Sequence, residues 1–314
     1  MKRFNTKTQL VRYFLKGCIG FFILGIIFAA LVALFDMINP KIISFAVDSV
    51  IGDKAGELPF GLNSIVTRLG GVSELRAHPY WIAIMIAIIA GLGGVCRYLF
   101  RRSNAEGAER LVKRMRDKLF SHIMKLPYTW LGENSTGDII QRCTSDVDTI
   151  KRFLSEQMTL LIRVIILIAM SLAFMISISP LLTLIAAAFI PVIIGYSVYF
   201  HRHIASAFEK ADVQEGKLST IAQENLTGVR VVRAFGREKY EKERFEKQNI
   251  EYTGFWIHLM RLLSLFWSTG DVMSGLQVLL VTVLGAVFCV NGQITAGQYI
   301  AFVSYNTMLR WPVR

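Results

Sequence analysis

Long stretches without charged side chains alternate with blocks rich in charge, and this segregation constrains the fold more than any other feature of the sequence. Residues 17–35 form a run of 19 positions without Asp, Glu, Lys or Arg, and residues 79–96 form a run of 18. About 20 predominantly apolar residues in a helix cross a hydrocarbon core of about 30 Å. Each of these two runs therefore predicts one membrane-spanning helix.

Two longer charge-free runs each predict a pair of spans. Residues 164–201 and 272–309 both contain 38 positions without a charge, and a single helix of that length would extend for about 57 Å. Pro180 interrupts the first run and the sequence Asn291-Gly292-Gln293 is a turn signal within the second. We therefore predict an all-α membrane protein with six transmembrane helices. Their expected ranges are about 17–47, 79–100, 157–178, 180–202, 258–290 and 294–314.

The distribution of Lys and Arg predicts the orientation of these spans, because basic residues are retained on the cytoplasmic side of a membrane. Residues 1–16 carry five basic and no acidic side chains, whereas residues 48–79 carry three basic and four acidic ones. Basic groups also outnumber acidic ones by twelve to seven in residues 97–154 and by eleven to nine in residues 201–261. We therefore expect a plasma-membrane protein with a cytoplasmic N-terminus, an extracellular loop at 48–78 and two large cytoplasmic blocks.

Several other classes of protein are disfavoured by the same patterns. The net charge of +12 is accounted for by the topology signal, so a nucleic-acid partner is not expected. The first span is longer than the core of a typical signal peptide and is followed by no small-residue cleavage site, so we expect it to stay attached. The four cysteines are widely spaced, and the sequence therefore predicts no metal site. No catalytic residue is predicted either.

The first cytoplasmic block is predicted to continue the helices of the membrane. Residues 97–125 contain no Pro and only one Gly, and Leu111, Met115 and Leu119 recur at a spacing of four, which is typical of an amphipathic helix. Pro127 should end this helix, because proline lacks the backbone donor that a helix interior needs. A polar corner then leads into a second helical stretch that begins at about Asp138 and rises into the third span.

The second cytoplasmic block repeats this design. We expect the fourth span to continue to about Arg233, to turn near Phe235-Gly236 and to return from Lys239 to Arg261. The two blocks are thus predicted to be helical hairpins, a first arm at 101–156 and a second arm at 203–257. Each would project about 40 Å beyond the bilayer.

Motifs in both arms and near both ends of the chain resemble the exporter type of ABC transporters. Residues 136–142 and 145–148 (Thr-Gly-Asp-Ile-Ile-Gln-Arg and Ser-Asp-Val-Asp) resemble the first intracellular loop of that family, and residues 224–238 resemble the second. Residues 34–48, which end in Val47-Asp48, are similar to the first helix, and residues from Thr295 onward are similar to the sixth. The resemblance covers nearly the whole chain in the right order.

The resemblance implies a partnership with an ATPase that the sequence itself does not contain. Exporters of this family pair two membrane halves, as a homodimer or a heterodimer, and move a hydrophobic or amphipathic substrate across the lipid bilayer. ATP and Mg would bind to nucleotide-binding domains, yet no phosphate loop is present: residues 215–219 resemble the end of one, but Ala211 replaces its first Gly. Family exporters extend beyond the position of Trp311-Pro312, so a chain that ends at Arg314 is not expected to hydrolyse ATP or transport by itself.

The resemblance also implies that each arm carries a short coupling helix at its tip and that the tips dock on the nucleotide-binding domains. An aromatic side chain at a tip, Phe235 or Trp130, would enter a groove of the ATPase. The charges of Arg142, Arg237 and Glu238 would set the register. The alternative for Arg142 and Asp146 is local capping and pairing within the arm. The residues predicted to couple to the ATPase are Trp130, Glu133, Asn134, Gly137, Asp138, Arg142, Phe235, Gly236, Arg237 and Glu238.

A second group of residues is predicted to line a substrate pathway. Charges in or near a span are costly and are usually functional or paired, and Arg163 and Asp271 are both expected near the inner boundary, where they could pair. Asp36 should lie deeper and could hold a cationic substrate. Structural pairing of the charges and lipid contact of the aromatic residues are the alternatives. The predicted pathway residues are Asp36, Arg163, Asp271, Phe266 and Trp267.

The function predicted from these patterns is the membrane-spanning half of an ATP-driven exporter that works by alternating access. Two other functions remain open for the same sequence, a membrane scaffold or receptor without transport and a passive channel. ATP-stimulated uptake into inverted vesicles would separate an exporter from both.

Overall fold

The computed structural model describes residues 9, 13–52, 62–68 and 71–313, which are helical apart from short connections and include no β-strand. Five helices among them are long and apolar enough to cross a membrane: Ile19–Ile51, Tyr80–Ile123, Thr136–Ile176, Pro180–Thr227 and Glu238–Val290. The predicted fold class is therefore confirmed, and the chain is a multi-pass membrane protein. Most of the N-terminal basic residues, Lys2, Arg3, Lys7 and Arg12, and the last residue Arg314 lie outside the described residues.

The chain divides into two compact units, which are described separately. Unit 1 consists of Met1–Thr183 with Leu284–Pro312, and unit 2 consists of Leu184–Val283 with the last two residues.

Unit 1 begins with two long helices that pack on each other. α2 (Ile19–Phe45) continues as the π-helix η1 (Ala46–Ile51) and packs against α5 (Tyr80–Ile123). Two short helices, α3 (Leu62–Arg68) and α4 (Gly71–Ala77), lie in the predicted extracellular loop. Their Val66 and Leu75 are buried in one cluster with Ile42 and Phe45 of α2. The described part of the predicted extracellular loop thus contains two helices, which are too short to show a helical period in the sequence.

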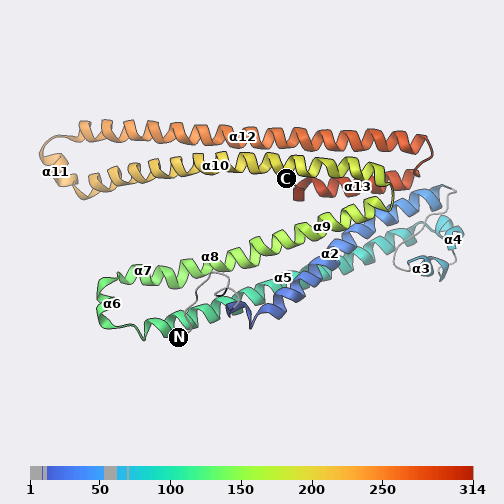
Figure 1. The fold of residues 1–314 in the computed structure, drawn as a ribbon, viewed down its shortest axis with the longest axis horizontal. Coiled ribbons are helices and arrows are strands. Elements are labelled where there is room, and N and C mark those ends of the chain that lie inside the picture. Colours follow the sequence, from blue (N-terminus) through green and yellow to red (C-terminus); the bar gives the residue numbers. More distant parts are fainter. Residues whose placement is uncertain (1–8, 10–12, 53–61, 69–70, 314) are drawn as a thin grey trace. The chain divides into compact units, whose positions relative to one another are not determined.

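The first arm is a hairpin with several helical segments in its returning leg (Figure 1). α5 continues past the predicted span as expected, and after Pro127 the chain forms a short helix, α6 (Tyr128–Glu133). It lies just before the residues that resemble the first intracellular loop, where the resemblance implies a coupling helix. Leu111 and Met115 are buried against Phe14 and Val147, as their spacing predicts. The returning leg consists of α7 (Thr136–Gln141), η2 (Arg142–Asp146), α8 (Val147–Arg152), η3 (Phe153–Gln157) and α9 (Met158–Ile176), of which η2 and η3 are π-helical.

The last helix of unit 1 is α13 (Ala296–Val313), which covers the sixth predicted span. It is not among the five strongly apolar helices, because it carries polar side chains along its length. One of these, Asn306, is buried within the protein together with Phe302, Tyr305 and Leu309. Tyr305 donates a hydrogen bond to the backbone oxygen of Met37, 2.9 Å away, so this helix packs against α2.

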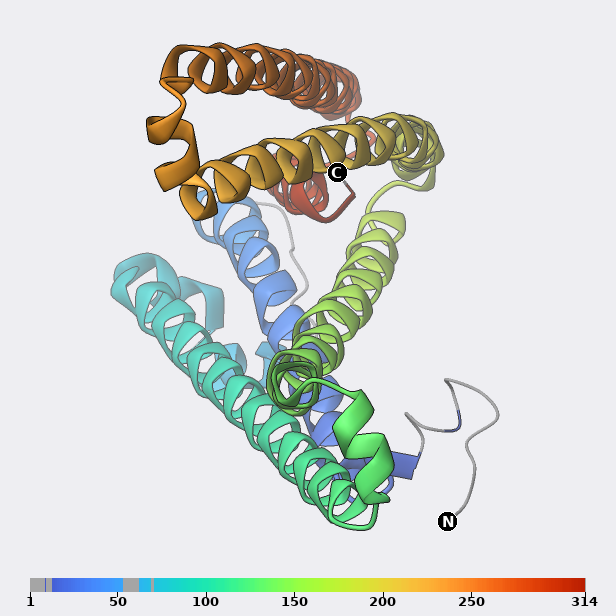
Figure 2. The ribbon, with the colours of Figure 1, turned by 90° about the vertical axis from the view of Figure 1, so that its left-hand side faces the viewer.

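Unit 2 is built on one long helical hairpin (Figure 2). α10 (Pro180–Thr227) begins at the proline that the sequence marks as the turn, and α12 (Glu238–Val290) runs back along it. A short helix, α11 (Val229–Ala234), connects them after a break at Gly228 that the sequence analysis did not predict. The turn at Phe235-Gly236 lies where it was expected.

Candidate functional site

The tip of the first arm is organised by hydrogen bonds within α6 and α7. The side-chain amide of Asn134 donates to the backbone oxygen of Trp130, 2.8 Å away, which fixes the end of α6. Ser135 is the N-cap of α7, and its hydroxyl oxygen accepts a hydrogen bond from the backbone N–H of Asp138 at 3.2 Å. Tyr128 remains 88% exposed. The tip is therefore an ordered turn with an exposed aromatic ring.

Arg142, one of the predicted coupling residues, is engaged within its own arm. Its guanidinium lies 2.9 Å from the carboxylate of Asp138, one helical turn earlier. Local pairing was the alternative for this residue, with Asp146 as the expected neighbour. Both side chains of the observed pair are largely exposed, so the pair contributes little to stability and leaves both groups accessible. Glu133 and Gly137 are exposed at the same tip.

The tip of the second arm is closed by a Schellman motif at the end of α11. The N–H of Arg237 donates to the oxygen of Val232 at 3.0 Å and the N–H of Gly236 donates to the oxygen of Arg233 at 3.2 Å. Gly236 has a φ of 60°, which only glycine adopts readily. Phe235 stands beside it with 77% of its surface exposed. Arg237 and Glu238, which begin the return leg, are exposed as well.

A substitution at Gly236 should test this turn. We expect Gly236→Ala to destabilise the tip by about 1 kcal/mol, because a side chain in the left-handed region is strained even where space is open. Gly216 lies in the interior of α10 with no atom near an added Cβ, so Gly216→Ala should stabilise the same arm by about 1 kcal/mol. Hydrogen exchange of the backbone amides in residues 203–257 measures both changes. The turn would be misassigned if both variants changed exchange in the same direction.

The two legs of the second arm are joined by polar contacts at three levels. Arg244 lies 2.9 Å from the carboxylate of Glu224, Gln248 donates to Gln214 at 2.9 Å, and the hydroxyl of Tyr252 donates to Glu215 at 3.2 Å. The hydrogen bond to Glu224 raises the pKa of Arg244 above its usual value. These pairs fix the register of α12 on α10 and hold the tip at the end of a defined hairpin.

The first arm has a corresponding set of contacts between α5 and its returning leg. Asn104 donates to the backbone oxygen of Ser155 at 2.6 Å, Lys151 pairs with Glu109, and Arg116 lies 2.9 Å from the carboxylate of Asp148. Sequence reasoning missed all six pairs of the two arms, because each joins residues on different legs that no local pattern relates. The only feature of the sequence that could have indicated these pairs is the content of charged and amide side chains in both legs of each arm.

The predicted pathway residue Asp36 has a partner that the sequence did not suggest. Its carboxylate lies 3.1 Å from the guanidinium of Arg97, which stands at the first position after a charge-free run. Arg97 and Arg163 also line one polar cavity of about 360 Å³ within unit 1. Arg163, predicted to pair with Asp271, thus lies near Asp36 and Arg97. The residues around the cavity are Ala29, Val32, Arg97, Phe100, Arg101 and Arg163.

The other three predicted pathway residues belong to unit 2. The ring of Phe266 stacks on that of Tyr196, with centroids 5.6 Å apart, and the hydroxyl of Tyr196 donates to the backbone oxygen of Phe266 at 2.5 Å. Trp267 contacts Phe266 edge-on and is half exposed. Asp271 lies on the same helix, and its pairing with Arg163 stays a prediction because the two residues belong to different units.

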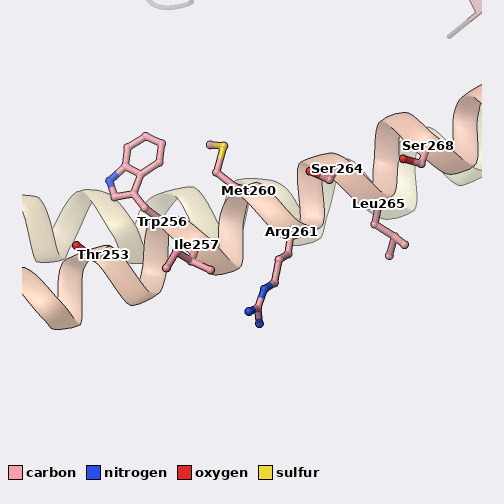
Figure 3. Close-up of a pocket in the computed structure, with 8 residues that line it drawn as sticks. All are labelled: Thr253, Trp256, Ile257, Met260, Arg261, Ser264, Leu265 and Ser268. Carbon is pink, nitrogen blue, oxygen red and sulfur yellow. The ribbon is translucent and has the colours of Figure 1, made fainter.

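A shallow hollow of about 570 Å³ lies along residues 253–268 of α12, the stretch that also contains Phe266 and Trp267. Figure 3 shows its side chains rising from a single helix, with Trp256 and Met260 on one side and Arg261 and Leu265 on the other. Neither Phe266 nor Trp267 is among its lining residues. It adds nothing to the predicted pathway.

The structure thus consists of long apolar helices that continue as two hairpin arms with ordered, exposed tips. The family model described as the ABC transporter transmembrane region matches residues 22–313. The chain belongs to this family and forms the membrane half of a transporter. The exporter-type resemblance of its motifs is therefore confirmed.

Curated relatives are similar to this chain along much of its length. The multidrug resistance-like ATP-binding protein MdlA of Buchnera aphidicola is 27% identical over 322 residues, which cover 100% of this chain and 50% of that protein. An uncharacterized ABC transporter ATP-binding protein of Bacillus subtilis, YknU, is 26% identical over 246 residues, 78% of this chain and 41% of its own length. An ATP-dependent lipid A-core flippase of Aromatoleum aromaticum is 26% identical over 249 residues, which cover 79% of this chain and 40% of that protein. The chain spans about half or less of these relatives.

Proposed function

We propose that the chain provides the substrate pathway of an ATP-driven exporter and is moved by nucleotide-binding domains that dock on the tips of both arms. The observation that carries this proposal is the exposure of Tyr128 and Phe235 at tips whose turns are held by hydrogen bonds. Exposed aromatic residues on ordered turns are suited to fill pockets of a partner, because little conformational entropy is lost on binding.

The resemblance to ABC exporters supports the remaining parts of the proposed mechanism. Two membrane halves pair, ATP and Mg bind to the nucleotide-binding domains, and closure of those domains switches the pathway between inward and outward access. The spans lie in the plasma membrane of the cell. Both arms and the N-terminus face the cytoplasm. ATP hydrolysis belongs to the nucleotide-binding domains and not to residues 1–314.

The cargo proposed for this pathway is hydrophobic or amphipathic. The relatives that are named as a lipid A-core flippase and a multidrug resistance-like protein favour such cargo. A cation held by Asp36 would have to compete with Arg97, which already contacts its carboxylate. The aromatic group of Tyr196, Phe266 and Trp267 suits apolar parts of a substrate.

Truncation of an exposed tip residue tests the docking role directly. In vesicles that contain this chain with its nucleotide-binding domains, we expect Phe235→Ala to reduce ATP-driven transport at least tenfold, because a side chain that is 77% exposed is available to the partner. Thermal unfolding of the chain should be unchanged. Ile250→Ala is the matched control, since Ile250 is 67% exposed on the leg of the same arm and away from the tip. Equal transport by both variants would remove the docking role.

Uptake into inverted vesicles distinguishes the exporter from its alternatives. An exporter should accumulate a fluorescent amphipathic substrate only when ATP and Mg are supplied. A passive channel would equilibrate the substrate without ATP, and a scaffold or receptor would give no uptake under either condition. Both of these outcomes would contradict the proposal.

A further inference from the structure

A pocket of about 580 Å³ lies between α10 and α12, where the second arm meets its two predicted spans. Its charged and titratable side chains are His203 and Lys210 from α10 and Glu251 and His258 from α12. All residues that line it belong to unit 2. We call it the histidine pocket. Neither its histidines nor its lysine belongs to the docking tips or to the predicted substrate pathway.

The polar side chains of the histidine pocket lie at two levels of the hairpin. The hydrogen bonds that join the legs set their register, which places His203 opposite His258. Lys210 and Glu251 lie at a second level, seven residues farther along each leg, which is about 10 Å in a helix. The fourth and fifth predicted spans meet the arm at the level of the two histidines. The headgroup layer of a bilayer adds about 5 to 8 Å on each side of the hydrocarbon core, so the pocket covers the level at which lipid headgroups are expected.

The apolar part of the pocket continues toward the membrane. Leu262 follows His258 by about one helical turn, inside the fifth predicted span, and Phe255 supplies a half-buried ring between the two polar levels. Gly254 lies beside Phe255, and a Cβ atom added there would meet no atom within 4 Å. The missing side chain keeps the pocket open. Polar groups at the arm end and a leucine at the membrane end match the polarity of a phospholipid.

His203 is held so that one of its nitrogens can serve a ligand. Its Nδ1 lies 2.9 Å from the backbone oxygen of Tyr199. Because a carbonyl oxygen can only accept a hydrogen bond, Nδ1 carries a proton, and Nε2 is the atom that gains one when the ring becomes charged. The ring of Tyr199 lies 4.4 Å away, between centroids, which is close enough to favour an imidazolium by a cation–π contact.

The charge of the pocket is decided by its two histidines. The charges of Lys210 and Glu251 cancel, so the lining is neutral when both imidazoles are neutral and carries two positive charges when both are protonated. Imidazole is the side chain that ordinarily changes charge between about pH 5 and 8. His201, Arg202 and Arg261 are exposed at the same level of the two helices. Basic groups beside a membrane attract acidic lipids, so the surroundings favour an anion as well.

We propose that the histidine pocket binds the phosphate of an acidic phospholipid and holds it more tightly when His203 and His258 are protonated. The phosphate accepts charge-assisted hydrogen bonds from the two imidazolium rings, the polar end of the headgroup lies between Lys210 and Glu251, and an acyl chain follows Leu262. The orientation proposed above places this lipid in the cytoplasmic leaflet. The site itself requires neither ATP nor transport.

Lipid binding to the protein in detergent tests the site. The chain, assembled with its nucleotide-binding domains and without ATP, is titrated with dioleoyl phosphatidylglycerol at about pH 6 and pH 8, and bound lipid is counted by native mass spectrometry. We expect the dissociation constant to be about fivefold lower at pH 6, because protonation adds positive charge to the pocket. Dioleoyl phosphatidylcholine, which has no net charge, should show no such change. A pH response shared by both lipids, or absent with phosphatidylglycerol, would overturn the proposal.

Substitutions of the two histidines assign the response to this pocket. His203→Gln with His258→Gln should abolish it. His203→Arg with His258→Arg should give tight binding at both pH values, a gain that a misfolded protein cannot show. His201→Gln is the matched control and should keep the response, because His201 is exposed at the same level and does not line the pocket. A response that survives the paired Gln substitutions, or that is lost in the control, would contradict the assignment.

Two further measurements identify the ligand and its position. Inorganic phosphate in large molar excess should leave phosphatidylglycerol bound, because it lacks the acyl chain, and Gly254→Leu should weaken lipid binding at both pH values by filling the pocket. Displacement by phosphate would mean that a free anion is the ligand, and full binding to the Gly254→Leu variant would mean that the lipid lies elsewhere. Each result would overturn the proposal. Absent transport with the expected lipid binding would contradict only the proposed function.

Discussion

Gly297→Ala is expected to prevent α13 from docking on α2 and to cost about 3 kcal/mol or more of folding free energy. The added methyl group would meet the backbone oxygen of Ser44 at 2.1 Å, and a backbone oxygen cannot rotate away as a flexible side chain can. We expect a lower yield of folded protein and a lower midpoint of thermal unfolding in detergent.

Gly275→Ala is the matched control for this substitution. Gly275 lies in α12, within a predicted span, and a Cβ atom added there has no neighbour within 4 Å. Its replacement should leave the unfolding midpoint unchanged or raise it. Similar midpoints for the two variants would show that the close approach of Gly297 to α2 is not present in the folded protein.

Asp36→Ala is expected to destabilise unit 1 by about 2 kcal/mol. The substitution leaves Arg97, Arg101 and Arg163 around one cavity without the acid that contacts Arg97. Breaking a buried ion pair costs about 3 to 5 kcal/mol, and a smaller value is expected here because the Asp36 side chain is 32% exposed. Thermal unfolding in detergent measures the change.

The reason for this loss can be checked by a second substitution in the same chain. If the unpaired charge of Arg97 causes the destabilisation, Asp36→Ala combined with Arg97→Gln should recover most of it, whereas Asp36→Ala with Arg102→Gln should not. Arg102 pairs with Glu106 on the surface of α5 and is the matched control. If the double variant Asp36→Ala with Arg97→Gln loses as much stability as the two single variants together, Asp36 stabilises the fold by another contact.

The spans and arms could be predicted from the sequence because both depend on local composition. The length of a charge-free run alone decides whether it can cross a bilayer. The spacing of Leu111 and Met115 likewise places both on one side of a helix, whichever residues pack against them. Pro127 and Pro180 likewise act on their own backbone. The spans, arms and turns could therefore be predicted without knowing which segments of the chain contact one another.

The contacts of the candidate site could not be predicted because they join distant parts of the chain. Asp36 was expected to face a substrate, yet Arg97, 61 residues later, lies beside it. Val47-Asp48 and the residues from Thr295 onward were both recognised as motifs, but nothing in either string indicates that one accepts hydrogen bonds from the other. The short helix α6 was implied only by the family resemblance, because six residues do not show a helical period of their own.

The two arms differ in how their legs are wound, and this difference has a mechanical consequence. Both legs of the second arm are uninterrupted α-helices up to the tip, α10 and α12. The returning leg of the first arm contains two π-helical segments, η2 and η3, and π-helical turns interrupt the regular α-helical hydrogen bonding at places where helices bend. We therefore expect the second arm to act as a stiff rod and the first as a compliant one, so that equal displacements of the two tips move the membrane helices by unequal amounts.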